Sequence, residues 1–188
     1  MSLTSITELY QSTSLPVAVI GGSPSAPNDI EALPSNCLII SANHHAYRLG
    51  LKVDYFVFKE ANPKSHTHLW EKILEPQGAK IISTNVIYSD YQINVRKWDR
   101  GYSGHLATWL GTYVTSGPVI ICGMDCYTGK EHYFDNENAG SYGGNRTLDI
   151  YLRQWELSLG KDPKDKGLDH ERVYAVSGPL TKIFKKWK

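Results

Sequence analysis

The fold is decided by residues 100–133, whose sequence is RGYSGHLATWLGTYVTSGPVIICGMDCYTGKEHY. Apolar residues recur at helical spacing after Ser103 until Gly117 and Pro118, so this spacing predicts a helix that begins at Ser103. Residues 119–122 are a continuous apolar run rich in β-branched side chains, and such a run predicts a strand that is buried on both faces. A buried strand of this kind is typical of a parallel sheet covered by helices.

A polar cluster comes directly after this strand, at residues 123–127. Open parallel sheets bind their ligands outside the carboxyl ends of the strands, because the loops leaving those ends are not covered by the packed helices. The helix that begins at Ser103 would present free backbone N–H groups and a partial positive charge near the same crevice. The stretch therefore predicts a binding site for an anionic ligand.

The rest of the chain continues this alternation, and the expected fold is α/β: a single-domain Rossmann-like α/β/α sandwich with a mostly parallel sheet, spanning residues 1–188. The pattern is too weak to assign residues 1–15, which we expect to be poorly ordered, and 85–98 is ambiguous. Further strands are expected at 16–20, 37–41, 54–58, 79–83 and 172–176, the last of these being the final strand. Helices are expected at 29–33, 44–49, 63–74 and 147–159, with a terminal helix starting at Gly178 and Pro179.

Composition excludes several classes of protein. Hydrophobic residues make up 41% of the 188 residues and charged residues 21%, as in ordinary globular domains and unlike disordered chains. The net charge of +1 gives no bias towards nucleic acid, so no nucleic-acid partner is expected. The basic segment 182–188 is interpreted as the solvated face of a terminal helix rather than as a contact with an anionic membrane surface.

The cellular context follows from cysteines and hydropathy. There are three cysteines, and Cys37 and Cys122 fall inside apolar strands, so we expect reduced core residues of a cytosolic protein. No apolar run approaches the roughly 20 residues that span a bilayer, and no signal-peptide pattern is present. We therefore expect a cytoplasmic protein without integral membrane association.

The turn after the first strand is the next candidate site. Its sequence is Gly21-Gly22-Ser23-Pro24-Ser25. A glycine pair lets the backbone turn sharply beside a ligand, and the serine hydroxyl and N–H groups can bind phosphate or sugar oxygens. A plain tight turn explains the same residues equally well.

Two more polar residues stand at expected strand ends. Asn43 offers a donor and an acceptor that suit a cytosine edge or a ribose, and it could equally cap the helix at 44–49. Lys59 could offer its charge to a carboxylate or phosphate, or be an ordinary solvated lysine. The pairs His44/His45 and His66/His68 do not place both rings on one helix face, so no metal site is expected from them.

A set of residues in this chain has the spacing of a known family: Arg100, Ser103, Gly104, Gly123, Asp125, Tyr127 and Tyr133. This pattern, with twenty residues from Ser103 to Gly123, resembles the core of the bacterial lipo-oligosaccharide sialyltransferases. The same core recurs in motility-accessory-factor glycosyltransferase-like proteins and in archaeal 6-hydroxymethylpterin pyrophosphokinase-like proteins. It therefore marks a superfamily more securely than one reaction.

The resemblance implies a transferase that moves a sugar from CMP-sialic acid to an acceptor hydroxyl, with inversion and without a metal or other cofactor. Tyr127 and Tyr133 would stabilise the charge on the leaving phosphate. Ser103 and Gly104 would hold the carboxylate of the donor, and Arg100 would contact an anion or the acceptor. Gly123 and Asp125 belong to the same substrate-binding core.

The resemblance also implies contacts outside this core. The family carries a Gly-x-Gly-Pro-Ser loop that binds the cytidine nucleotide, and Ser23 stands here in place of its second glycine. Asn43 would contact the nucleotide, and Lys59 would lie near the donor sugar. The implied partners are a nucleotide sugar and an acceptor that the sequence does not identify. Related transferases often form homo-oligomers, so self-association stays open.

One element of the family pattern is missing. The family's general-base histidine falls at Gly144, and no histidine lies between Tyr133 and Asp169. His132 is the nearest substitute, with Tyr142 and Asp135 as weaker candidates, although His132 could be an ordinary surface residue.

Three functions therefore stay open. The first is a CMP-sugar glycosyltransferase, and the second is a non-catalytic nucleotide or nucleotide-sugar sensor, which would account for the missing base. The third is a magnesium-dependent pyrophosphokinase-like enzyme, which would use acidic residues such as Asp99, Asp125 and Asp135.

Overall fold

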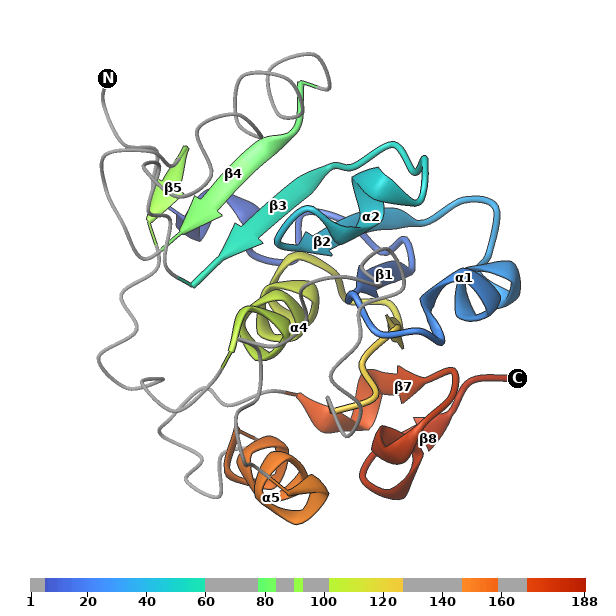
Figure 1. Cartoon of the computed structure of the whole chain (residues 1–188). Coiled ribbons are helices and arrows are strands. Elements are labelled where there is room, and N and C mark those ends of the chain that lie inside the picture. Colours follow the sequence, from blue (N-terminus) through green and yellow to red (C-terminus); the bar gives the residue numbers. More distant parts are fainter. Residues whose placement is uncertain (1–5, 60–77, 84–89, 93–101, 127–146, 159–168) are drawn as a thin grey trace, which may run out of the picture.

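The computed structural model describes residues 6–59, 78–83, 90–92, 102–126, 147–158 and 169–188, and within them the strands form one eight-stranded sheet in the order β5-β4-β3-β2-β1-β6-β7-β8 (Figure 1). The strands are β1 (Val17–Ile20), β2 (Leu38–Ala42), β3 (Tyr55–Phe58), β4 (Lys80–Ser83), β5 (Tyr91–Gln92), β6 (Val119–Cys122), β7 (Val173–Ala175) and β8 (Lys185–Lys186). Every pairing between these strands is parallel, and this confirms the expected α/β fold.

Helices cover both faces of the sheet. The α-helices are α1 (Ala26–Asp29), α2 (His45–Arg48), α4 (Ser103–Val114) and α5 (Leu148–Ser158). Short 3-10 turns occur at η1 (Ile6–Leu9), η2 (Ile30–Ala32), η7 (His170–Arg172) and η8 (Pro179–Lys182). Alternate residues of each strand point to opposite faces, so the sheet has a core on each side. Val17 and Val19 pack with α4 and α5, whereas Ala18 and Ile20 pack with the α2 side.

The central strands follow the prediction closely because they are buried on both faces. β1 lies between β2 and β6, and all four of its residues are fully buried. β6 has the predicted bounds, and the other predicted strands that the structure describes are shifted or shortened by one or two residues at their ends. Burial on both faces requires a run of apolar side chains, and that run is visible in the sequence.

The carboxyl-terminal segment differs from the prediction. The strand expected at 172–176 is not the last one, because β8 adds a parallel edge strand in which Lys185 pairs with Tyr174. The expected terminal helix is only the 3-10 turn η8, so the basic tail is not a helix face. Both residues of β8 are exposed. An exposed edge strand pairs through its backbone and needs no apolar side chains, so the sequence contains no apolar run that would predict it. The charges of its two lysines discourage pairing with a further strand.

Smaller differences occur elsewhere. The helix expected at 29–33 begins earlier, as α1, and continues as η2. Cys37 precedes β2 and is only partly buried, whereas Cys122 and Cys126 are buried, and all three are free thiols. Burial raises the pKa of the Cys126 thiol to about 12, with a smaller contribution from the charge of Asp125. The helix expected at 63–74 lies outside the described residues.

The described helices also bear on membrane insertion. In this part of the chain, no helix combines the length and the apolar character that a bilayer crossing requires.

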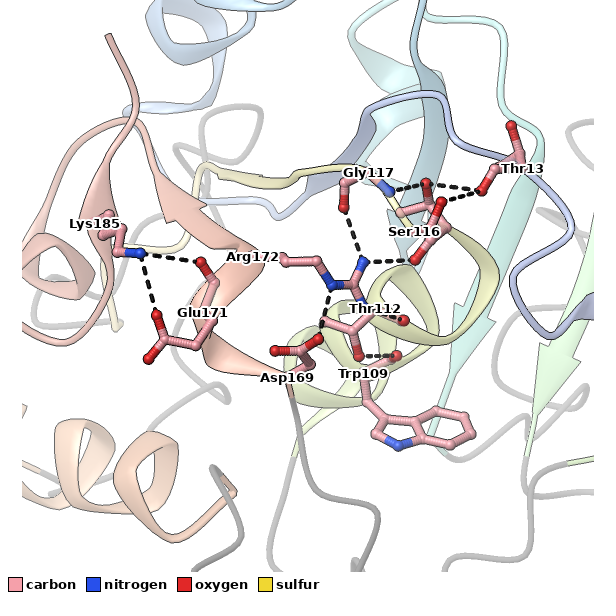
Figure 2. A network of polar contacts seen from close by, with 10 residues as sticks. Thr13, Trp109, Thr112, Ser116, Gly117, Asp169, Glu171, Arg172 and Lys185 are labelled. Atoms are coloured by element: carbon pink, nitrogen blue, oxygen red, sulfur yellow. Dashed lines mark hydrogen bonds and ion pairs between the residues drawn. The ribbon is translucent and has the colours of Figure 1, made fainter.

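A single arginine holds the carboxyl-terminal end of α4 (Figure 2). Arg172 Nη1 donates to the carbonyl oxygens of Thr115 and Gly117, at 2.6 and 2.9 Å, and Nη2 donates to that of Thr112 at 3.0 Å. Arg172 Nε donates to Asp169 at 2.7 Å. The last carbonyls of a helix have no partner within the helix and carry partial negative charge, so a guanidinium satisfies and stabilises them. This contact fixes the end of α4 and the turn after it to the start of β7.

Candidate functional site

The topology places the candidate site between β1 and β6. From β1 the chain builds β2 to β5 outward in one direction, and it then returns to place β6 on the other side of β1. At such a switch point the loops leaving the two adjacent strands diverge and leave a crevice at their carboxyl ends. The loop after β1 begins at Gly21 and the loop after β6 begins at Gly123. Both of these loops contain predicted site residues.

The two loops are joined directly by their backbones. Gly21 N donates to Cys122 O at 2.8 Å, and Ser23 N donates to Gly123 O at 2.9 Å. A side chain at position 21 would place its Cβ only 2.4 Å from Gly123 O, so only glycine fits there. Ser23 is buried, and its Oγ accepts a hydrogen bond from Asp125 N at 2.9 Å. The N–H and the hydroxyl oxygen of Ser23 therefore bind the neighbouring loop.

Two carboxylates complete the connection between the loops. Ser25 Oγ lies 2.7 Å from Asp125 Oδ1 and 3.2 Å from Asp29 Oδ2, and Ser25 N donates to Asp125 Oδ2 at 3.2 Å. Asp29 is buried and accepts the N–H of Gly123 at 2.8 Å. A buried carboxylate needs such donors to offset its lost hydration. Asp29 and Asp125 thus hold the loop after β1 and the loop after β6 together.

Asn43 occupies the adjacent strand end in an unusual backbone conformation. Its φ is 58°, in the left-handed region, and its N–H donates to Val57 O at 2.9 Å. Asparagine tolerates this region better than most residues, and such outliers concentrate at functional sites. The expected helix-capping role is wrong, because α2 begins later and its Ala46 N–H is capped by Ser41 Oγ at 3.0 Å. The expected interaction with a nucleotide stays a prediction.

His45 lies directly over the glycine turn, and the sequence reasoning missed it as a site residue. A Cβ at Gly22 would fall 2.3 to 2.7 Å from the atoms of the His45 ring, so the ring occupies the space of a side chain at position 22. His45 is 3% exposed. The sequence analysis named His45 only as part of the pair His44/His45, from which no metal site is expected. The one available signal for a site residue was that this histidine comes shortly after the end of a predicted strand.

The start of α4 meets the end of β3. Ser103 is the first residue of α4, and its Oγ accepts a hydrogen bond from Lys59 N at 3.1 Å. Two predicted site residues from separate segments are therefore in contact. Gly104 is closely packed, since a Cβ there would lie 3.0 Å from Met124 Sδ and the methionine would have to shift slightly. The same methionine would contact a Cβ at Gly21, at 2.7 Å from Met124 Cγ. Met124 thus packs against both candidate binding segments.

His105 is a second histidine that the sequence reasoning did not single out. It is 6% exposed, and its ring is stacked on Trp155 of α5 with the centroids 3.9 Å apart. Its Nδ1 accepts the backbone N–H of Tyr102 at 3.1 Å. Burial, and to a smaller extent the positive charge of Lys59, lower the pKa of His105 to about 3. The imidazole is therefore neutral at ordinary pH and is a poor general base.

The remaining predicted residues lie outside the described part of the chain: Arg100, Tyr127, His132 and Tyr133, together with the weaker alternatives Asp135 and Tyr142. Gly144, which stands at the position of the family's general base, lies outside it as well. Their roles stay predictions. Among the described residues, no three or more His, Cys, Asp or Glu side chains group in a way that could hold a metal ion. The acidic pair Asp29 and Asp125 is bonded to the loops themselves.

Comparisons with known proteins bear on the fold. No protein-family model and no curated protein gives a match to this chain. Among solved structures, it is similar to the monofunctional alpha-2,3-sialyltransferase Cst-I from Campylobacter jejuni, with a TM-score of 0.60 at 14% identity over 93% of this chain and 81% of the other.

Two structures of a second enzyme are similar as well. The sialyltransferase CstII from Campylobacter jejuni in complex with a substrate analogue, cytidine-5'-monophosphate, gives a TM-score of 0.59 at 13% identity over 93% of this chain and 85% of that one. CST-II in complex with a trisaccharide acceptor and CMP gives 0.53 at 12% identity over 92% and 86%. The chain thus has the fold of these sialyltransferases, as the sequence pattern indicated.

Proposed function

We propose that this protein binds a CMP-sialic-acid-type nucleotide sugar at the carboxyl edge of β1, β2, β3 and β6 and transfers its sugar, with inversion and without a metal ion. The observation that supports the proposal is the meeting of four predicted binding segments at this edge. They are the turn 21–25, Asn43, the contact between Lys59 and Ser103, and residues 123–125. The shared fold with sialyltransferases solved with CMP adds to this support.

The charges along the edge suit a donor with anionic groups. Lys59 and the first N–H groups of α4 create a positive region at the end of β3. The amide of Asn43 stands one strand away and offers both a donor and an acceptor to a nucleoside. In the proposed reaction, Tyr127 and Tyr133 stabilise the departing phosphate, and Arg100 contacts an anion or the acceptor.

A second candidate function is a nucleotide-sugar sensor without catalysis. The sequence supports it, because Gly144 stands where the resemblance places the general base. General acid-base catalysis typically contributes about a hundred- to ten-thousand-fold, so a chain without a substitute base would bind the donor and turn it over slowly or not at all. In the transferase, His132 is the proposed substitute.

Calorimetric titration tests the binding step. CMP, CDP, CTP, GTP and ATP are each titrated with and without magnesium, the metal-free samples containing EDTA. We expect CMP to bind equally well in both conditions. In thermal unfolding of the same samples, CMP should also raise the melting temperature, because a ligand that binds only the folded chain stabilises it. Binding of a triphosphate only in the presence of magnesium would instead favour the pyrophosphokinase-like enzyme and would refute the proposal.

A matched pair of variants tests whether Asn43 contacts the ligand. Asn43→Gly keeps the left-handed backbone at little cost and removes the amide, so CMP affinity should fall about tenfold while the fold is kept. Gln11→Gly is the control, since Gln11 also has a positive φ of 44° and its N–H bonds Tyr113 O near the opposite end of α4. If both variants bind CMP as tightly as the parent chain, Asn43 is not a contact.

Turnover then separates the transferase from the sensor. Consumption of CMP-sialic acid is followed for the parent chain and for Tyr127→Phe, Tyr133→Phe and His132→Ala. In the transferase each change slows turnover while CMP still binds. In the sensor the parent chain binds CMP and releases none from CMP-sialic acid above the background rate. Full turnover in both phenylalanine variants would contradict the proposed catalytic roles.

A further inference from the structure

The buried imidazole of His105 has one nitrogen to which no described residue is hydrogen-bonded. His105 is the third residue of the twelve-residue helix α4, and it is 94% buried, being 6% exposed. Its Nδ1 binds the N–H of Tyr102, at the residue before the helix. Its Nε2 is buried, and none of the residues that the structure describes forms a hydrogen bond with it.

The hydrogen bond at Nδ1 determines whether Nε2 carries the proton of the neutral imidazole. A backbone N–H can only donate, so Nδ1 must present its lone pair to Tyr102. In a neutral imidazole the proton then resides on Nε2, which becomes a hydrogen-bond donor. A buried donor without an acceptor is unfavourable and uncommon in native structures. Within the part of the chain that the structure describes, Nε2–H is therefore a buried donor without an acceptor.

The groups around His105 indicate the charge of a suitable acceptor. The Lys59 backbone N–H is bonded to Ser103 Oγ at 3.1 Å, so a residue with a cationic side chain lies at the start of the same helix. Ser103 Oγ accepts that bond, so its own hydroxyl proton is available as a second donor. The first N–H groups of α4 add partial positive charge. Donors and positive charge together suit an anionic oxygen.

The ring is also held in place before any ligand binds. It is stacked on Trp155 at an interplanar angle of 27° and lies beside the ring of Tyr102, with the centroids 5.9 Å apart. Together with the bond at Nδ1, these contacts restrict rotation of the imidazole. A donor fixed in this way loses little conformational entropy when it binds a ligand.

We propose that His105 is a ligand-contact residue of an anion subsite at the start of α4, where its Nε2–H, Ser103 and Lys59 together bind a carboxylate or phosphate oxygen. The inference rests on the proposed function, which supplies two such groups: the nucleotide phosphate and the carboxylate of an acidic sugar. Nε2 is covered in this structure, so the oxygen reaches it only when a neighbouring side chain moves.

Imidazole NMR tests this inference directly. Long-range ¹H–¹⁵N spectra of the full chain are assigned with His105→Gln and then recorded during titration with inorganic phosphate, N-acetylneuraminic acid, cytidine and CMP. We expect the free protein to carry the proton on Nε2. That signal should shift with an anionic ligand and not with cytidine. A proton on Nδ1, or a signal that no anion moves, would overturn the inference.

The same titrations distinguish its failure from failure of the proposed function. A shift with phosphate or with N-acetylneuraminic acid, without any CMP binding, would support the subsite and refute the CMP proposal. Binding of CMP that leaves the His105 signal unmoved, with the other anions also without effect, would refute the subsite alone. A response to N-acetylneuraminic acid only would identify the carboxylate as the bound group, and a response to phosphate and CMP only would identify the phosphate.

Two variants give a second readout through affinity. His105→Gln can accept from Tyr102 N and still donate, whereas His105→Phe keeps an aromatic ring beside Trp155 and loses both bonds. The ratio of CMP affinity to cytidine affinity should fall about ten- to a hundred-fold in His105→Phe and stay within a few-fold in His105→Gln. Equal losses for both ligands would show a structural role only and would overturn the inference. If His105→Phe does not fold, the NMR titrations decide.

Discussion

Replacing Arg172 should destabilise the protein far more than replacing a nearby exposed lysine (Figure 2). In Arg172→Met the three carbonyl bonds to α4 and its following turn are lost, at 2.6, 2.9 and 3.0 Å. The arginine side chain is 25% exposed, so water partly replaces these bonds and about 1 kcal/mol for each is a suitable value. Loss of the cation at a helix carboxyl end adds about 0.5–1 kcal/mol. The expected total is roughly 3–4 kcal/mol.

The assay is urea denaturation followed by circular dichroism, with the free energy of unfolding taken from the midpoint and slope. Lys185→Met is the control: its ion pair with Glu171 joins side chains that are 59% and 70% exposed, and such pairs contribute about 0–1 kcal/mol. Arg172→Lys keeps the charge but lacks the planar set of donors, so it should fall between the two. Equal midpoints for Arg172→Met and Lys185→Met would refute the view that this guanidinium fixes α4.

Three further predictions concern the site. The pKa of His105 is about 3 in the folded chain and has its ordinary value in the unfolded chain. The contribution of the neutral imidazole to the free energy of unfolding should therefore be fully present above about pH 6.5 and fall by about 1.4 kcal/mol per pH unit towards pH 3. Urea titrations at several pH values should show that His105→Gln removes one proton from this slope. Gly22→Ala places a Cβ 2.3 Å from the His45 ring and should lower the free energy of unfolding by about 1–3 kcal/mol in thermal unfolding. Adding His45→Ala to the same chain should remove most of this loss, whereas additive losses would contradict the contact. Asp29→Ala removes the carboxylate that accepts the buried N–H of Gly123 at 2.8 Å, and it should lower the free energy of unfolding by about 2–3 kcal/mol in urea denaturation. An unchanged midpoint would show that the loops do not depend on this carboxylate.

The fold was largely predictable because its signals are local. Strands buried on both faces need apolar residues, and residues 119–122 show this in an unbroken run whose bounds agree with those of β6. The helix beginning at Ser103 shows apolar spacing along its length, and it starts where expected. Edge strands lack this signal: β8 consists of two exposed lysines that pair through their backbone, so the sequence suggested a helix there.

The candidate site was predictable in part. Polar residues after buried strands indicated Asn43 and Lys59, and the start of a predicted helix indicated Ser103. The parallel topology brings all three to one edge of the sheet. What their side chains and backbones bind there was not predictable. Lys59 and Ser103 are 44 residues apart in the sequence and meet in a single hydrogen bond. No sequence pattern in either segment predicts that these two residues are in contact.

The sequence by itself determined the parallel α/β architecture and the edge at which polar residues gather, because burial and periodicity act over a few neighbouring residues. Only the tertiary structure decided that Ser25 and Asp125, 100 residues apart, lock the two loops together, and that His45 fills the space above Gly22. It also decided that His105 is a buried neutral donor. Each of these facts depends on which distant groups the folded chain places within a few ångströms, and hydrogen bonds, steric contacts and desolvation all act at that range.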